Sequence, residues 1–161
     1  MKKSKLKTKK LTSVAIIKRR LFRLVSQICR ENANFTCEVC GLKNGDKHPN
    51  TGKIQHVEAH HIMSRNNKNS PLKFDLRNIS CLCSSCHKHD KFSAHKHGLW
   101  FAMWFLEHRL DDATWIIEHT NDVVNLDDRH VLEIIEYCLL HKLPLDLKTH
   151  NITYIEEKSN T

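Results

Sequence analysis

The chain has 161 residues, of which 40% are hydrophobic, and a formal net charge of +8 at pH 7. This size and apolar content fit one domain with a modest core and exclude a wholly disordered chain. The charge is uneven, because residues 1–30 hold eleven Lys or Arg and no acidic residue, whereas residues 98–161 hold five basic residues against twelve acidic ones. A basic end of this kind is typical of a protein that binds DNA or another polyanion, although Lys-rich termini also serve as solubilising tails.

The basic end divides into two parts. Residues 1–12 are Lys-rich without apolar periodicity, which predicts a basic flexible arm. From Ser13 onward apolar residues recur at helical spacing, and we expect an amphipathic basic helix within residues 13–34. Four basic side chains between the apolar positions are candidate DNA contacts: Lys18, Arg19, Arg20 and Arg23.

The cysteines and the apolar segments indicate the cellular compartment in which the protein is found. Seven cysteines are an odd number, and two Cys-x-x-Cys pairs favour a metal over disulfides in a reducing environment. The apolar run from Val14 to Ile17 is too short for a secretion signal, and no segment reaches the roughly 18 apolar residues that span a bilayer. We therefore expect a cytoplasmic protein that has no membrane partner.

The two Cys-x-x-Cys pairs predict a structural zinc site. Four thiolates can close a tetrahedral zinc shell, and the free energy of metal binding then stabilises the fold. Gly41 directly follows the first pair and allows the tight turn that two converging thiolates need. Cys81 is an alternative to Cys83 as a zinc ligand. The predicted zinc ligands are Cys37, Cys40, Cys83 and Cys86.

The segment between the pairs predicts a strand over residues 53–62, a long loop, a second strand over residues 78–82 and a helix that begins near Ser84. Beyond it, residues 98–161 predict a C-terminal helical extension. This extension holds an aromatic-rich helix from Leu99 to Leu110 and a helix that begins at Asp127-Asp128 and ends near Leu140. The stretch from Thr114 to His119 is ambiguous between strand and helix.

Residues 35–97 resemble a known family. The order Cys37, Cys40, His60-His61, Asn78, Cys83, Cys86-His87 is similar to that of the HNH (His-Me finger, ββα-metal) nucleases. The resemblance implies an α+β fold, in which a ββα-metal (HNH) finger with a four-cysteine structural zinc is flanked by N- and C-terminal helices. It also implies a metal-dependent endonuclease that hydrolyses DNA phosphodiester bonds.

The same resemblance assigns roles to four residues. His60 would be a ligand of the catalytic metal, and His61 would be the general base that takes a proton from the attacking water. Asn78 would hold the long loop and orient His61 through backbone contacts. His87 would be the second metal ligand.

The sequence departs from the family at the next position. Many members carry a further histidine four residues after the second ligand, where this chain has Lys91. The third protein ligand is therefore His89, His95 or none. A site with only two protein ligands favours Mg²⁺ or Mn²⁺, although two imidazoles also suit Ni²⁺ or Zn²⁺.

A narrower resemblance concerns the segment from Ala59 to Arg65 and the segments around Asn78 and His87, which are similar to phage recombination endonucleases of the NinG type. It implies a branched or recombination-intermediate DNA substrate and a location in the cytoplasm of a bacterial host cell. Arg65 would then bind the scissile phosphate in a bidentate way, or it is an ordinary exposed loop charge.

Two other functions fit the same residues. A non-catalytic zinc-binding module that docks on DNA is compatible with the missing histidine at position 91. An RNase or toxin-like nuclease is compatible with the basic arm. The oligomeric state is open, and a homodimer would follow if the protein makes double-strand cuts, because such a cut requires two active sites.

Overall fold

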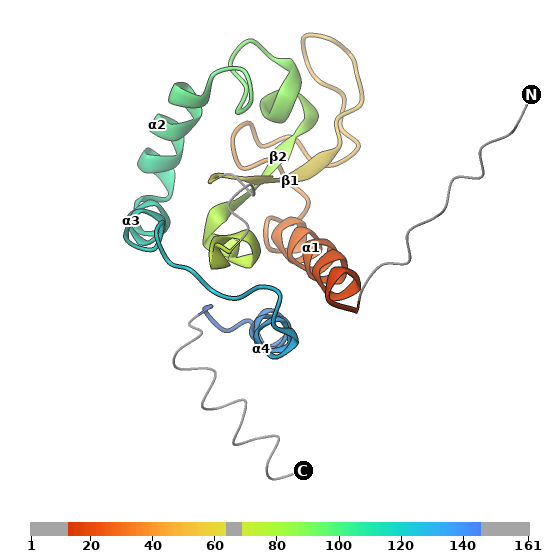
Figure 1. The fold of residues 1–161 in the computed structure, drawn as a ribbon. Coiled ribbons are helices and arrows are strands. Elements are labelled where there is room, and N and C mark those ends of the chain that lie inside the picture. The colour runs from red at the N-terminus through yellow and green to blue at the C-terminus, as the bar shows by residue number, and fades with distance from the viewer. Residues whose placement is uncertain (1–12, 64–68, 146–161) are drawn as a thin grey trace, which may run out of the picture.

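The computed structural model describes residues 13–63 and 69–145, and it has an α+β fold (Figure 1). None of its described helices is both long and apolar enough to cross a membrane. The helices and strands are α1 (Ser13–Asn32), β1 (Val57–His61), β2 (Ile79–Cys83), a five-residue helix (Ser85–His89), α2 (Gly98–His108), α3 (Leu110–Glu118) and α4 (Arg129–Leu140), with two short 3₁₀ turns at Pro71–Phe74 and Leu76–Asn78.

The two strands form an antiparallel sheet in the middle of the molecule (Figure 1). In this register His60 pairs with Ser80, and His61 pairs with Ile79. Adjacent side chains of a strand point to opposite faces of the sheet. The two neighbouring histidines therefore face different surroundings, one toward α2 and the other toward α1.

The predicted basic helix is confirmed as α1. Its buried face includes Leu21 and Val25, which pack in the main core together with Phe74 and Leu82. Fully burying a side chain of this kind contributes about 1.5–3 kcal/mol. The apolar stripe of α1 thus anchors the helix on the sheet, and the opposite face with its basic residues remains at the surface.

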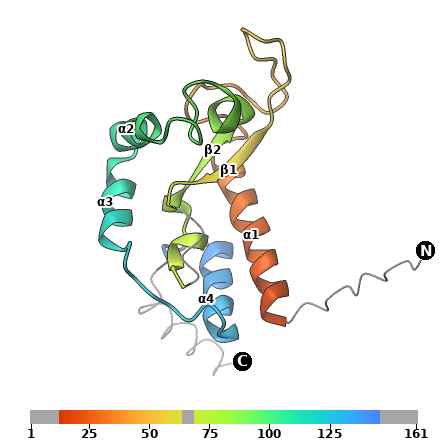
Figure 2. The same cartoon turned by 45° about the horizontal axis from the view of Figure 1, so that its top comes forward.

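The predicted start of the last helix is also confirmed. The Asp128 side chain accepts a hydrogen bond of 2.8 Å from the backbone N–H of His130, as expected of a helix N-cap. Leu132 and Ile135 of α4 are buried in the main core, and α4 lies beside α1 in both views (Figures 1 and 2). The C-terminal extension therefore completes the core that α1 and the sheet begin.

The aromatic-rich helix is confirmed as α2, whose Phe101 and Phe105 are buried. The ambiguous segment from Thr114 to His119 lies largely in a helix, α3. The break between α2 and α3 is Arg109, whose backbone angles (φ −140°, ψ 52°) are not helical and interrupt the helical path. The helix predicted from Leu99 to Leu110 thus ends at His108, and α3 follows it at an angle (Figure 2).

Arg109 also fixes these helices to the sheet. Its Nη1 donates to the carbonyl oxygen of Ile79 at 2.8 Å and to Ser80 Oγ at 3.1 Å. Its Nη2 donates to the carbonyl oxygens of Leu76 and Arg77, both at 3.3 Å. The planar guanidinium can bind several backbone acceptors at once. It therefore holds the turn before β2 in place.

Candidate functional site

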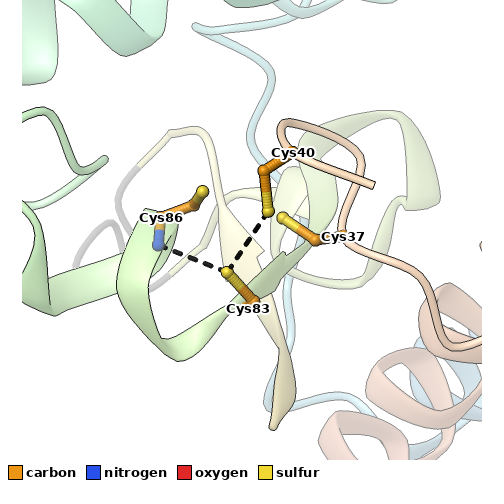
Figure 3. A group of neighbouring side chains, drawn as sticks. All are labelled: Cys37, Cys40, Cys83 and Cys86. Carbon is orange, nitrogen blue, oxygen red and sulfur yellow. Dashed lines mark hydrogen bonds between the residues drawn. The ribbon is translucent and has the colours of Figure 1, made fainter. Parts of the chain in front are cut away.

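Four thiols converge near the end of the sheet (Figure 3). Their sulfur atoms all lie within 4.8 Å of one another, and the sulfurs of Cys40 and Cys83 are 3.7 Å apart. A tetrahedral zinc ion with Zn–S bonds of about 2.3 Å sets its sulfurs about 3.8 Å apart. The chain therefore brings together the four predicted ligands in a cluster that fits a metal ion such as zinc: Cys37, Cys40, Cys83 and Cys86.

The turn that carries the first pair has the predicted glycine geometry. Gly41 has φ +74°, and its N–H donates to the carbonyl oxygen of Cys37 at 2.9 Å. Glu38 docks this turn on β2, because its N–H donates to the carbonyl oxygen of Cys81 and its carboxylate accepts from the N–H of Cys81 at 2.7 Å. Cys81 is thus used through its backbone, and its buried thiol is not a member of the cluster.

The crowded thiols favour a bound cation. Hydrogen bonds from Cys83 and Cys86 lower the pKa of the Cys37 thiol to about 2. The hydrogen bond to Cys37 raises the pKa of the Cys83 thiol to about 12, and contact with both neighbours raises the pKa of Cys86 as well. The ionisation of one thiol makes the ionisation of its neighbours less favourable, since like charges at this distance repel. A divalent cation removes that cost.

A second cluster lies on the other side of β1 and contains three histidines. The ligand nitrogens of His60, His87 and His95 lie within 4.8 Å of one another. The Nε2 atoms of His87 and His95 are 3.1 Å apart. The rings line a cavity of about 510 Å³ whose wall also includes Phe101 of α2. Three imidazoles facing one point in a cavity can hold a metal ion and leave room for a substrate group.

His95 reaches this cluster because the preceding helix is short. The helix after β2 ends at His89, and the chain turns back so that the N–H of His95 donates to the carbonyl oxygen of His87 at 3.2 Å. Lys91 points away, with its Nζ 5.5 Å from the centre of the Phe92 ring, and His89 is exposed outside the cluster. Of the two histidines considered for the third position, the structure brings only His95 to the other two.

A carboxylate orients one of the three rings. His87 Nδ1 lies 2.7 Å from Glu58 Oε2 and donates to it, so that Nε2 is the nitrogen turned to the cluster. Glu58 also pairs with Lys88 at 2.6 Å. A carboxylate behind a metal-binding histidine fixes its tautomer and raises its basicity. Glu58 was not among the site residues predicted from sequence, although alternation along β1 places it on the same face as His60.

Burial keeps two of the clustered rings, His60 and His87, neutral. Burial lowers the pKa of His60 to about 3, and the nearby rings of His87 and His95 are smaller causes of the same shift. Burial also lowers the pKa of His87, although Glu58 opposes this shift. Since only a neutral imidazole binds a metal ion, both rings are ready to act as ligands at neutral pH.

Replacing Glu58 with glutamine is expected to weaken metal binding at the histidine cluster about 10- to 100-fold, because His87 loses its anionic partner. Isothermal titration calorimetry of the protein with Ni²⁺ or Mn²⁺ measures this affinity. The matched control is Lys88→Gln, which removes the other partner of Glu58 and leaves the carboxylate on His87. Equal affinities for wild type and Glu58→Gln would show that the contact does not support metal binding.

His61 lies outside the histidine cluster but opens on the same cavity. Its Nε2 is 3.0 Å from the carbonyl oxygen of Lys73. A carbonyl oxygen only accepts, so this nitrogen carries the proton and the lone pair of the neutral ring is on Nδ1. The tautomer is therefore the one in which Nδ1 is the basic atom.

Asn78 holds the backbone on which His61 depends. Its buried amide accepts a hydrogen bond from the N–H of Met63 at 2.8 Å and donates to the carbonyl oxygen of Leu72 at 2.9 Å. Leu72 immediately precedes Lys73, whose carbonyl oxygen accepts from His61. Residues 64–68 between these two contacts lie outside the described residues, and this includes Arg65.

The four basic residues predicted on α1 divide into two kinds. Lys18 Nζ is 2.6 Å from Asp127, and Arg20 pairs with Glu136 of α4. Arg19 and Arg23 are exposed, and neither makes an ion pair with any residue in the ranges 13–63 and 69–145. The basic arm, residues 1–12, lies outside the described residues.

The chain thus combines a four-thiol cluster, a three-histidine cluster and a further histidine, His61, on the cavity that the three histidines line. Comparisons with protein families, with curated proteins and with solved structures found no match. The functional inference therefore rests on the chemistry of these side chains and on the sequence resemblance to the HNH nucleases.

Proposed function

We propose that this protein is a metal-dependent endonuclease of the HNH type, with a ββα-metal finger, and that it hydrolyses phosphodiester bonds of DNA. The observation that carries the proposal is the arrangement of neighbouring His60 and His61 on one cavity. His60 turns to His87 and His95, while His61 is held separately by a backbone carbonyl. A phosphodiester hydrolase needs these two things side by side, a cation for the phosphate and a base for the water.

Three imidazoles would hold the catalytic metal: His60, His87 and His95. The cation would stabilise the negative charge that develops on the phosphate and on the departing 3′ oxygen. Mg²⁺ prefers oxygen ligands. Imidazole binds Mn²⁺ more readily than Mg²⁺, and it binds Ni²⁺ or Zn²⁺ more readily still. The third histidine therefore shifts the expected preference from Mg²⁺ toward a transition metal such as Mn²⁺, Ni²⁺ or Zn²⁺.

His61 would act as the general base. Nδ1 accepts the proton of the attacking water, and the imidazolium that forms is stabilised by its Nε2–H bond to the carbonyl oxygen of Lys73. Asn78 is a positioning residue in this scheme, because its amide fixes the backbone beside that carbonyl. By resemblance to the family, the products are a 5′-phosphate and a 3′-hydroxyl.

The thiol cluster would have a structural role. Its four sulfurs tie the turn after α1 to the end of β2 and to the short helix that carries His87. A zinc ion there would fill the shell with protein ligands and leave no position for substrate. The thiol cluster thus stabilises the elements that carry the histidine cluster.

The direct test is incubation of the purified protein with supercoiled plasmid, with and without Mg²⁺, Mn²⁺, Ni²⁺ or Zn²⁺, beside RNA of matched sequence. Metal-dependent nicking of DNA supports the proposal. DNA binding without cutting would indicate the non-catalytic zinc module, and preferential RNA cleavage would indicate the RNase. A four-way junction compared with linear duplex tests the narrower, NinG-like preference for branched DNA.

Replacing His95 with alanine is expected to lower the affinity of the histidine cluster for Ni²⁺ or Mn²⁺ by at least about tenfold, because one of three ligands is lost. The exposed His89 provides a control, since His89→Ala removes an imidazole six residues away without touching the cluster. Metal titration and nicking rate are measured for both variants. If His89→Ala weakens binding and His95→Ala does not, His95 is not the third ligand.

A further inference from the structure

The surface of α1 carries a groove of about 670 Å³ that the proposed mechanism does not use. It is open to solvent on the side of α1 that does not face the core. The groove is lined by one aromatic ring and by basic and polar side chains, chiefly Lys18, Arg19, Phe22, Arg23, Gln27 and Arg30.

Three arginines form one positive row along this groove. Arg19, Arg23 and Arg30 are four and seven residues apart in turn, which places them on the same face of a helix. Within the part of the chain that the structure describes, no carboxylate pairs with any of the three. Their charges are therefore available to an anionic ligand, unlike those of Lys18, which pairs with Asp127 just before α4, and Arg20, which pairs with Glu136 of α4.

The groove lies next to the cavity of the histidines. Phe22 lines the groove, and its ring centre is 6.3 Å from that of His61 in an edge-on arrangement. Phe22 also packs on Phe74 with ring centres 4.8 Å apart, which fixes its position. His61 in turn lines the cavity of about 510 Å³. A ligand lying along α1 would therefore pass Phe22 and reach the proposed base.

We infer that this groove binds the sugar–phosphate backbone of one DNA strand and leads it to His61. This inference rests on the proposed function, because it takes DNA as the substrate. Four residues of helix span about 6 Å, which is close to two phosphate steps of one strand measured along the duplex axis. Arg19 and Arg23 can thus bind separate phosphates, with Arg30 further along the same row.

A charge-matched pair of variants tests the groove. Arg23→Gln removes a groove arginine, and Arg20→Gln removes one positive charge from the same helix outside the groove. Binding of a fluorescent duplex is measured by anisotropy from 50 to 200 mM salt, and plasmid cleavage gives KM and kcat. Arg23→Gln is expected to raise Kd on the order of tenfold and to reduce the salt slope by about one, with kcat preserved at saturating DNA. Arg20→Gln is expected to change Kd much less.

The outcomes separate the groove from the nuclease. If the wild type cuts DNA and the two variants weaken binding equally, α1 acts through net charge alone and the groove assignment is wrong, while the nuclease proposal stands. Equal KM values for Arg23→Gln and wild type would have the same meaning. If the wild type neither binds nor cuts DNA, both the groove and the proposed function are overturned. Circular dichroism verifies that the variants are folded.

Discussion

Replacing His61 with alanine is expected to reduce the rate of DNA cleavage about 10²- to 10⁴-fold, the contribution of a positioned general base. The side chain is not a member of the metal cluster, and its hydrogen bond to Lys73 is replaceable by water. DNA affinity and metal content should therefore stay at the wild-type level. The measurement is the single-turnover rate of plasmid nicking at saturating protein.

The control for this variant is His56→Ala. His56 is exposed and precedes β1, so its removal tests whether loss of any nearby imidazole affects the rate. The control is expected to cut like the wild type. Wild-type cutting by His61→Ala would show that His61 is not the base, whereas a loss of DNA binding by that variant would show that its role is not confined to the chemical step.

Replacing Cys83 with serine is expected to destabilise the protein by more than about 4 kcal/mol, because one ligand of a structural metal is lost. Domains of this size are stable by only about 5–15 kcal/mol, so a large fraction of the variant should be unfolded at 37 °C. Thermal unfolding followed by circular dichroism and zinc content measured by mass spectrometry test this expectation together. Wild-type protein treated with a strong chelator should behave like the variant.

Cys81→Ser is the matched control, since Cys81 lies two residues away in the same strand and is equally buried. Burial raises the pKa of its thiol to about 12, so it is neutral at pH 7 and does not join the cluster. The control is expected to keep its zinc and to lose only about 1–3 kcal/mol. If Cys81→Ser loses its zinc and Cys83→Ser keeps it, the ligand is Cys81 and not Cys83.

The elements that local patterns determine were predicted from sequence. The helical spacing in α1, the capping Asp128 of α4 and the two Cys-x-x-Cys pairs are features of neighbouring residues, and the structure confirms each of them. The meeting of the two cysteine pairs across 42 residues was predicted because a metal shell requires four ligands.

Features that depend on where the chain turns were not predicted. The position four residues after His87 matters only if the helix continues, and the helix ends before it, which brings His95 to the site instead. Arg109 stands between α2 and α3, and its guanidinium binds carbonyl oxygens of a segment about thirty residues earlier. Tertiary contacts of this kind leave no local pattern in the sequence.

The separation of the basic residues on α1 is a further example. Periodicity places Lys18 and Arg20 beside Arg19 and Arg23 as charges of one helix, but Asp127, just before α4, and Glu136 of α4 pair with the first two. Which basic side chains remain without an acidic partner is decided by a segment about 110 residues later in the chain. The sequence shows the charge of α1 but not its partners.

The most direct test of the central claim is a titration of metal-depleted protein with Mn²⁺, in which metal binding to the histidine cluster and nicking of supercoiled plasmid are followed in the same samples. Depletion uses a weak chelator so that only the histidine cluster is emptied, and the zinc content of the thiol cluster is checked by mass spectrometry. The proposed function predicts that nicking rises in proportion to occupancy of the cluster and is absent from His61→Ala at equal occupancy. A fully occupied cluster in a protein that binds plasmid without cutting it would contradict the claim.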